Sequence, residues 1–506
     1  MPVYPGMTTT NEHAHRKTDP EASRRTPPVI RLLVLATFVV ILNETIMINA
    51  IPRLMTDLRV TEQAAQWLST AFMLTMAAVI PVTGWFLQRV STRRAYATAM
   101  GVFLAGTALA AVAPAFEILL LARIVQATGT AVMMPLLMTT LMTVVPEQDR
   151  GRVMGTVTMA MSVAPAMGPA VSGLILQLGS WRFLFAAVLP IAALITWRGL
   201  ARLENVGEPQ LSTIDWFSVG AAAVGFGSLV YGLSRFGAGG TAVPAIIVAT
   251  GLAAIAAFAL RQLRLQRRDV PLLDLRVLRH SGYALSLLLM ALGFMAMMGA
   301  MILLPIYLQN LRGLSPLQTG LLVMPGGLAM GLLGPVVGRL YDRFGARVLI
   351  IPGALGIVAA LAGLTQISMA MPYWQVLALH VLLMVSLAAA FTPVFTLGLG
   401  ALPAHLYSHG SSMLGTLQQV AAAFGTALVV TVMASRAESR VAGGAGQAMA
   451  QLDGMRLAFV IAAALAVVMV AAAFLLPKQT NPAEEPETAS ADIDLEDLEL
   501  TLEPAC

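Results

Sequence analysis

The sequence ILNETIMINAIP, residues 41–52, places a carboxylate inside a segment that is otherwise as apolar as a lipid-facing helix. A charged side chain near the centre of a bilayer costs about 2.5–3.5 kcal/mol on insertion scales, so an ionisable residue at that depth indicates a function. We therefore predict that Glu44 binds and releases a proton. The alternative is a neutral Glu44 that caps or hydrogen-bonds the local helix.

The composition around this stretch is that of a polytopic membrane protein. The chain has 506 residues, of which 58% are hydrophobic and 11% charged, and its mean hydropathy is +0.78. Apolar stretches of about 20 residues, the length that crosses a bilayer, recur along it. We predict fourteen spans, near residues 29–51, 64–87, 94–115, 117–145, 152–178, 183–200, 214–234, 242–261, 282–308, 317–340, 346–368, 373–398, 410–434 and 455–476.

The basic residues predict the orientation of these spans. An even number of spans puts both termini on one side of the membrane. With the termini in the cytoplasm, 22 of the 31 Lys and Arg residues fall on the cytoplasmic side and 8 on the other, while Arg123 lies inside the fourth span. The positive-inside rule therefore predicts cytoplasmic termini. It also accounts for the sequence pI near 9.6 without a nucleic-acid partner.

The pattern of spans and polar segments predicts the domain organisation. Residues 1–28 read as a disordered cytoplasmic arm, and the acidic residues 477–506 as a disordered cytoplasmic tail. Between them we expect an N-terminal six-helix bundle (29–200), a linker with two further helices (201–265), a cytoplasmic loop (266–281) and a C-terminal six-helix bundle (282–476).

The sequence has no apparatus for the common enzyme chemistries. The one cysteine, Cys506, allows neither a disulfide within the chain nor a thiolate metal cluster. No HExxH, GxSxG or Walker sequence occurs, so metal hydrolysis, serine hydrolysis and ATP drive have no visible motif. We expect no enzyme activity, no catalytic residues, no metal and no cofactor.

An internal repeat relates the two bundles. PVTGWFLQRVSTRR (81–94) and PVVGRLYDRFGARV (335–348) align without gaps. The aligned pairs are Gly84 with Gly338, Gln88 with Asp342, Arg89 with Arg343, and Arg93 with Arg347. We predict two pseudo-symmetric halves, spans 1–6 and 9–14, with spans 7 and 8 inserted between them, an architecture in which a midplane site alternates its access.

The two loops are predicted to act as a conformational latch. The glycine allows close helix contact, and Asp342 is expected to pair with the loop arginines or with a helix N-terminus in the second half. A surface-charge role is the alternative, but it accounts only for the arginines and leaves the repeated order of glycine, acid and arginine unexplained.

These motifs resemble those of the major facilitator superfamily, specifically its fourteen-span drug:proton antiporter branch. Residues 338–347 are similar to the GxxxDRxGxR loop motif, RIVQATGTA (123–131) to RxxQGxGxA, and APAMGPAVSG (164–173) to the antiporter motif gxxxGPxxGG. The resemblance spans roughly residues 30–476. It implies an all-α fold, a bacterial inner-membrane location, a small-molecule substrate, protons as co-substrate and multidrug efflux, and we expect a monomer.

The resemblance also implies roles for particular residues. The arginine of the RxxQ motif, here Arg123, is implicated in proton coupling, and Gly168, Pro169 and Gly173 are expected to form a tight seal between the halves. Where the branch carries an aspartate in span 1 this chain has Asn43, and Glu44 follows it. At 1.5 Å per residue, Glu44 and Arg123 both lie about 10 Å below the outer interface, so they can meet. A permanent ion pair that only orients two helices is the alternative.

The substrate can be predicted only as a class. Glu44 is the acid placed clearly within a span, which favours lipophilic cations or amphipathic drugs. The alternative is proton-coupled transport of one endogenous metabolite or lipid on the same scaffold. Polar contacts to a substrate are expected from residues of several spans, namely Asn43, Asn49, Gln126, Tyr307, Gln309, Asn310 and Gln418.

Overall fold

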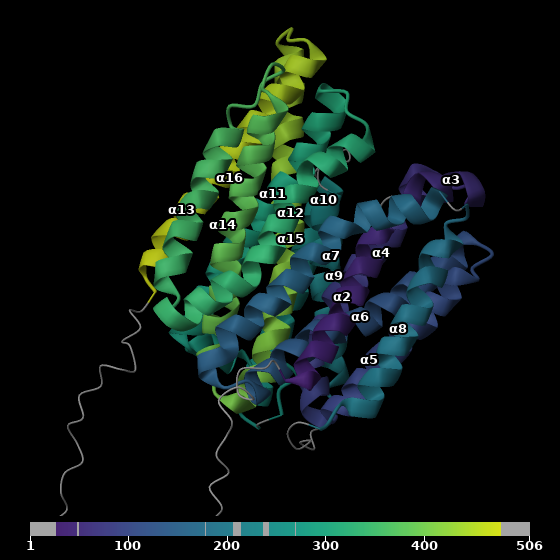
Figure 1. Ribbon diagram of the computed structural model, residues 1–506, viewed down its shortest axis with the longest axis vertical. Coiled ribbons are helices and arrows are strands. Elements are labelled where there is room, and N and C mark those ends of the chain that lie inside the picture. The colour runs from purple at the N-terminus through teal and green to yellow at the C-terminus, as the bar shows by residue number, and fades with distance from the viewer. Residues whose placement is uncertain are drawn as a thin grey trace, which may run out of the picture.

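The computed structural model describes residues 27–47, 50–177, 179–205, 214–235, 242–268 and 270–476, and every regular element within these ranges is a helix (Figure 1). The long helices are α2 (Pro28–Ile46), α4 (Glu62–Arg89), α5 (Thr92–Ala111), α6 (Phe116–Val144), α7 (Arg150–Gln177), α8 (Arg182–Arg202), α9 (Trp216–Ser234), α10 (Ala242–Gln266), α11 (Ser281–Ile306), α12 (Pro316–Phe344), α13 (Arg347–Leu364), α14 (Tyr373–Gly400), α15 (Tyr407–Ala442) and α16 (Gln447–Phe474).

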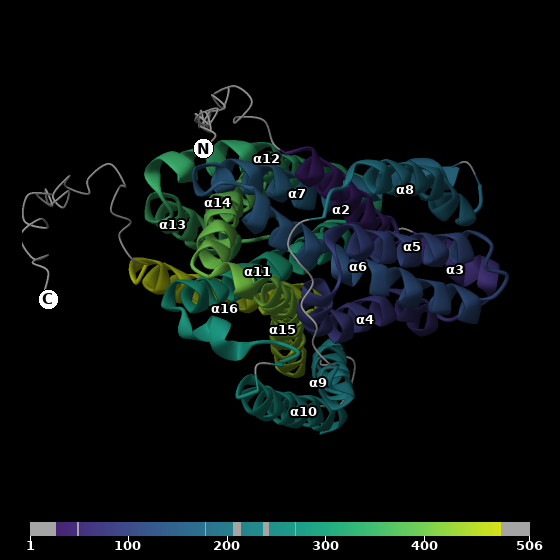
Figure 2. The ribbon, with the colours of Figure 1, turned by 90° about the horizontal axis from the view of Figure 1, so that it is seen from below.

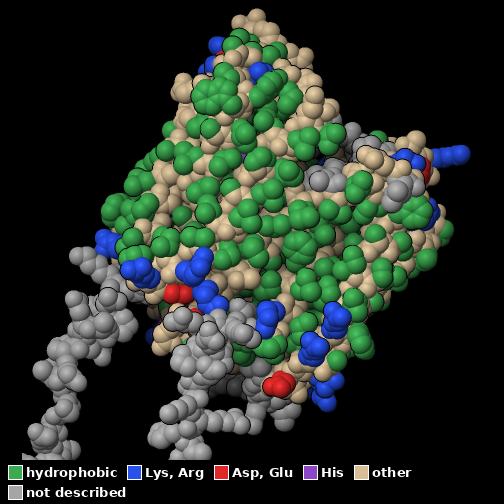
Figure 3. Space-filling model, viewed as in Figure 1, with side chains coloured by type: hydrophobic (Ala, Val, Ile, Leu, Met, Phe, Trp, Pro, Cys, Tyr) green, Lys and Arg blue, Asp and Glu red, His purple; other side chains and the backbone are tan. Residues whose placement is uncertain are grey.

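Thirteen helices of the described chain are long and apolar enough to cross a membrane. The remaining long helix is α5, whose first turn carries Arg93 and Arg94 and is therefore less apolar. One face of the molecule shows a broad apolar surface, with Lys and Arg side chains gathered mainly along its lower edge (Figure 3). A multi-pass membrane protein is thereby confirmed, because an apolar surface of this extent needs a lipid environment.

The first span is shorter than the sequence predicts. We expected one helix over residues 29–51, but α2 ends at Ile46 and a separate helix, α3 (Ile51–Leu58), begins after residues 48–49, which lie outside the described chain. Pro52 lies in the first turn of α3. Its ring and its missing N–H are tolerated at a helix start but not in a helix interior, which explains the break.

The long helices pack in two groups with a hairpin beside them (Figures 1 and 2). Helices α2 and α4–α8 contact one another, and so do helices α11–α16; we call these groups the first and second halves. Helices α9 and α10 pack against each other, and α9 also contacts α4 and α15. Figure 2 shows this hairpin lying outside the two halves.

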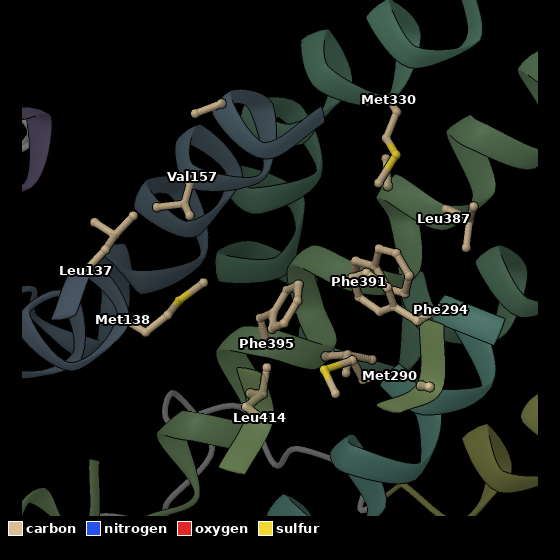
Figure 4. Close-up of a cluster of buried hydrophobic side chains, with 14 of the residues drawn as sticks. Leu137, Met138, Val157, Met290, Phe294, Met330, Leu387, Phe391, Phe395 and Leu414 are labelled. Atoms are coloured by element: carbon tan, nitrogen blue, oxygen red, sulfur yellow. The ribbon is translucent and has the colours of Figure 1, made fainter. Parts of the chain in front are cut away.

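The halves meet through α7 with α12, α4 with α15, α6 with α15, and α7 with α14. Apolar side chains from both halves come together in this region, among them Met138 of α6, Val157 of α7 and Phe395 of α14 (Figure 4). Phe294 of α11 stacks on Phe391 of α14, with 4.7 Å between ring centroids. The interface between the halves is therefore a packed apolar core as well as a set of polar contacts.

The loop after α10 connects the hairpin to this interface. Leu272 and Leu273, which follow α10, are each 1% exposed and pack in one cluster with Phe258 of α10. The amide oxygen of Gln262 accepts hydrogen bonds from the backbone N–H groups of both leucines, at 2.8 and 3.2 Å. Trp85 of α4 borders the same cluster, so the loop after α10 lies against the first half.

Candidate functional site

Glu44 lies in the last turn of α2 and is half-buried. Its neighbour Asn43 is fully buried, and neither atom of its side-chain amide has a hydrogen-bond partner. The hydroxyl of Thr45 donates to the backbone carbonyls of Ile41 and Leu42, at 3.3 and 3.0 Å. Glu44 as a residue therefore keeps some accessible surface, whereas the adjacent amide of Asn43 is fully enclosed.

Arg123 is held inside the first half by neighbours on two other helices. Its side chain is 1% exposed, and its guanidinium carbon lies 4.2 Å from the ring centroid of Phe72 on α4. One Nη of Arg123 donates to the amide oxygen of Gln126 at 3.1 Å. The amide nitrogen of Gln126 then donates to the hydroxyl of Thr107 on α5 at 2.9 Å.

Glu44 and Arg123 lie close enough for their charges to interact, and a role of the two residues in proton coupling remains a prediction. No ion pair or hydrogen bond between these two described side chains is recorded, whereas Arg123 is bonded to Gln126. The alternative of a fixed ion pair between α2 and α6 is therefore not the arrangement in this conformation. The acid remains free to change its protonation state or its partner.

The residues predicted to contact a substrate do not form one cluster. Gln126 uses both ends of its amide to join Arg123 to Thr107. Gln418 is half-buried on α15, and Asn49 lies outside the described residues. The remaining members follow α11, where Gln309 is half-buried and Asn310 is exposed. Substrate contact stays a prediction for each of them.

Tyr307 opens a short π-helix, Tyr307–Leu311, at the end of α11, and its side chain is completely buried. Its hydroxyl donates to the carbonyl of Ser368 at 2.7 Å and accepts from Arg312 at 2.7 Å. Arg312 also donates to the carbonyl of Met371 at 2.7 Å. In this conformation the hydroxyl of Tyr307 anchors the loop between α13 and α14.

Asp342 caps a helix of the other half. Its two carboxylate oxygens accept hydrogen bonds from the backbone N–H groups of Gly151 and Arg152, at 2.7 and 2.6 Å, in the first turn of α7. A carboxylate at a helix N-terminus is stabilised by both the unpaired N–H groups and the helix dipole. The prediction that Asp342 pairs with a helix N-terminus in its own half was wrong, because α7 belongs to the first half.

The first copy of the loop makes a weaker contact of the opposite polarity. Gln88 donates its amide to the carbonyl of His405, just before α15, at 3.1 Å. A Cβ added at Gly84 would lie 3.0 Å from Nδ1 of His409, so this glycine faces α15. The two loop copies therefore sit at equivalent junctions, α4 with α15 and α12 with α7, but only the second carries a charge.

The loop arginines take varied positions. The guanidinium carbon of Arg89 lies 5.6 Å from the ring centroid of Trp85, and that of Arg343 lies 5.0 Å from the ring centroid of Phe344. The backbone N–H of Arg93 donates to Asn205 at 3.3 Å. Arg347 is the first residue of α13 and is half-buried. A role of the four arginines in gating remains a prediction.

Glycines bring α7 and α12 into backbone contact. A Cβ at Gly338 would overlap the carbonyl oxygen of Gly151, and one at Gly334 would lie 2.5 Å from the carbonyl oxygen of Gly155. Only glycine permits this approach. Our sequence reasoning missed Gly151 and Gly155, although their spacing of four residues, matched by Gly334 and Gly338, was a signal for a close helix pair.

The span 5 motif meets the second half through Ala166, since a Cβ added at Gly327 of α12 would lie 2.7 Å from Cβ of Ala166, but its glycines face elsewhere. A Cβ at Gly168 would lie 2.7 Å from Cβ of Thr45 on α2, so this glycine packs within the first half. A Cβ at Gly173 would meet nothing within 4 Å. The side chain of Pro169 lies outside the described part of the structure. For Gly168 the expectation of an inter-half contact was wrong, because Thr45 of its own half occupies that side.

Polar contacts between the halves gather at one end of the molecule. We define the terminal end as the one where α2 begins and α16 ends. Besides the contacts of Asp342 and Gln88, this end has hydrogen bonds between paired hydroxyl groups and one from an arginine to a tyrosine. They join Thr83 with Ser412 (2.6 Å), Thr139 with Ser411 (2.8 Å), Thr158 with Thr392 (3.0 Å) and Arg150 with Tyr407 (3.3 Å).

These seven hydrogen bonds between the two halves all lie toward the terminal end. Glu44 lies at the other end of α2, 16 residues from Pro28, or about 24 Å along the helix axis. The halves are therefore joined by polar contacts far from the candidate proton site.

Comparison with known proteins agrees with this arrangement. Residues 33–426 match the family model of the Major Facilitator Superfamily. The chain is 38% identical over 459 residues to the uncharacterized MFS-type transporter YcnB of Bacillus subtilis, covering 90% of this chain and 96% of that protein. It is 35% identical over 448 residues to the lincomycin resistance protein LmrB of Listeria monocytogenes, covering 87% and 94%.

A solved structure shares the fold. The crystal structure of the human organic anion transporter MFSD10 superposes with a TM-score of 0.61 at 15% sequence identity, covering 87% of this chain and all of that one. The family match covers more than half of the chain, and two relatives exceed 30% identity over most of their length. The chain therefore belongs to the Major Facilitator Superfamily, as a membrane transporter and not an enzyme.

Proposed function

We propose that this transporter is a proton-coupled antiporter that exports lipophilic cationic or amphipathic drugs by alternating access. The observation that carries the proposal is an acid, Glu44, in the last turn of membrane helix α2, which within the described part of the chain forms no ion pair or hydrogen bond with Arg123, whose guanidinium is bonded to Gln126 instead. The lincomycin resistance activity named for LmrB supports drug export.

In the proposed cycle, Glu44 binds a proton and a cationic substrate in turn. A proton from the outer side neutralises the carboxylate and weakens its hold on a bound cation. Release of that proton to the cytoplasm restores the carboxylate for the next substrate. In a one-for-one exchange of a proton for a monovalent cation the two charge movements cancel, so the exchange is driven by the pH difference, at about 1.4 kcal/mol per pH unit.

The proposed topology has fourteen spans, namely the thirteen apolar helices and α5. The terminal end then faces the cytoplasm, in agreement with the distribution of Lys and Arg. The two halves correspond to residues 29–200 and 282–476, with α9 and α10 as an inserted pair, in a protein that works as a monomer. Because the polar contacts between the halves lie at the terminal end, this conformation is the one closed to the cytoplasm.

The antiport assay uses the purified chain in liposomes with an acidic lumen. Ethidium, a fluorescent lipophilic cation, and lincomycin serve as probes, and a trapped pH-sensitive dye reports lumenal protons. We expect ethidium to accumulate inside and its uptake to raise the lumenal pH. Movement of both species in one direction, or accumulation that ignores the gradient, would contradict antiport. Absence of proton-linked movement with both drugs would favour a specific endogenous substrate.

The cap of Asp342 on α7 predicts a change in the conformational equilibrium. Asp342→Asn replaces one acceptor oxygen by a donor and removes the charge, while the side-chain volume is kept. A charge-assisted hydrogen bond contributes about 1.5–3 kcal/mol, so we expect the population closed at the terminal end to fall about tenfold relative to the open one. Spin labels at the exposed residues Gln148 and Val348, in a Cys506→Ser background, would report a longer distance.

Gln88→Ala is the matched control, because Gln88 makes one neutral, exposed hydrogen bond at the equivalent junction. We expect its spin-label distances to stay close to those of the parent. Equal distance distributions for the parent and Asp342→Asn would show that the cap does not hold the two halves together.

A further inference from the structure

Gln126, which accepts a hydrogen bond from Arg123, is itself fixed by a hydrogen bond to Thr107. Gln126 accepts from Arg123 at 3.1 Å and donates to Thr107 at 2.9 Å, and the hydroxyl of Thr107 donates to the carbonyl of Phe103 at 2.7 Å. Both Gln126 and Thr107 are fully buried. Each group in this series of hydrogen bonds donates to the next one. The series therefore fixes the orientation of the Gln126 amide.

Close packing of α5 on α6 restricts the space around this series of hydrogen bonds. A Cβ at Gly106, the residue before Thr107, would lie 2.6 Å from the backbone nitrogen of Gln126 and 2.8 Å from its Cγ. The absent side chain of Gly106 therefore provides the space that Gln126 occupies. A network inserted between helices that nearly touch is preorganised, and its orientation does not depend on bound substrate.

The network sets where the charge of Arg123 lies relative to Glu44. The guanidinium is bonded to Gln126 on one side and stacked at 4.2 Å on Phe72, and its Nε has no partner. The charges of Glu44 and Arg123 act on each other. Among the described residues of α2 and of α4–α8, no other charged group acts on either one.

We propose that Thr107 is a positioning residue for proton exchange: through Gln126, it keeps the guanidinium of Arg123 out of a direct ion pair with Glu44. This inference rests on the proposed function, since it assumes that Glu44 carries the proton. Without the Thr107 hydroxyl, Gln126 is free to rotate, and Arg123 is released toward the carboxylate. A direct ion pair favours the charged carboxylate, so protonation then needs a more acidic solution.

The test measures protonation without any transported compound. Infrared spectra of the purified chain in lipid are recorded during a pH titration, and the carboxylic acid C=O band that disappears in Glu44→Gln is assigned to Glu44. For Thr107→Val we expect the midpoint of this band to move by about one pH unit toward acid, the lower end of the effect of an adjacent opposite charge. Thr107→Ser keeps the hydroxyl and should restore the parent midpoint.

Thr98→Val is the matched control. Thr98 lies on the same helix, and its hydroxyl donates to the carbonyl of Arg94 at 2.9 Å, as that of Thr107 does to Phe103, but it is exposed and receives no bond from another helix. Its midpoint should equal that of the parent. If Thr107→Val prevents folding, Gln126→Leu tests the same step and should shift the midpoint in the same direction.

The outcomes separate this inference from the function on which it rests. If the parent has no band that depends on Glu44, the acid does not titrate, and both proposals fail. If the band is present and its midpoint is the same in the parent, Thr107→Val and Gln126→Leu, only the positioning role of Thr107 is wrong. An acid shift that Thr107→Ser reverses supports the inference.

Discussion

Glu44→Gln is expected to abolish accumulation of drug against a gradient. The substitution keeps the size of the side chain but removes both the negative charge and the site where a proton binds. A difference of two pH units supplies about 2.7 kcal/mol per proton, enough for about 100-fold accumulation in a one-for-one exchange. Without a group that alternates between proton and cargo, this energy does not reach the drug. Proteoliposomes of the variant should therefore hold ethidium at its passive level.

The control for this result is Glu117→Gln, the same chemical change at the exposed start of α6. It lies on the helix that carries Arg123 but faces solvent, and we expect uphill accumulation to stay near the parent value. Uphill accumulation by Glu44→Gln at the parent rate would remove Glu44 from the mechanism, whatever the substrate.

The position of the acid matters as well as its presence. Successive residues of a helix point about 100° apart, so an acid at position 43 projects to a different side of α2. Asn43 is fully enclosed without partners, whereas Glu44 is half-buried. In the double variant Asn43→Asp with Glu44→Gln, we therefore expect accumulation to remain lost. Recovery would mean that either side of α2 reaches the proton pathway.

The sequence was sufficient for the all-helical fold class, and it singled out candidate residues whose roles remain predictions. Long apolar runs are unambiguous at membrane length, and the gapless alignment of the two loop copies indicates the junctions at Gly84 and Gly338. The charged pair was predictable because Glu44 and Arg123 are both anomalous inside apolar spans. These features are local, so the order of residues is enough to detect them.

Contacts between residues of two different helices could not be predicted in the same way. Nothing in the order of residues indicates that Gln126 faces Thr107, because that depends on the rotation of α5 against α6. Likewise, two glycines of α7 have different partners: Gly151 contacts α12, while Gly168 contacts α2. A glycine allows a helix to approach closely, but whether one does, and which one, is set by packing across the whole bundle.

The two junctions of the repeat also diverge in strength, and this asymmetry has a mechanistic consequence. Asp342 binds two N–H groups of α7 with a charged group, while Gln88 gives one neutral hydrogen bond near α15. The first kind of contact is worth roughly twice the second per bond. We therefore expect opening at the terminal end to be limited by separation of α12 from α7, with α4 and α15 parting more easily.

Gly338→Ala tests this step directly, because it adds one methyl group where α12 touches α7. That methyl would overlap the carbonyl oxygen of Gly151, which is part of the α7 backbone and cannot move aside as a side chain does. Overpacking of this kind costs about 1–3 kcal/mol, and here the cost falls only on the conformation with the terminal end closed. We expect that conformation to lose about 10–100-fold in population and ethidium export in cells to fall at least tenfold.

Gly320→Ala on the same helix is the matched control, since a Cβ there would meet nothing within 4 Å. Both substitutions raise helix propensity by about 1 kcal/mol, so weakening of α12 cannot explain a loss of export. Membrane insertion of both variants is measured by the amount of protein in purified membranes. Equal export by Gly338→Ala and Gly320→Ala would show that the closed contact between α7 and α12 is not on the transport cycle. Loss of export in Gly338→Ala alone would place this backbone contact among the steps that every transported molecule requires.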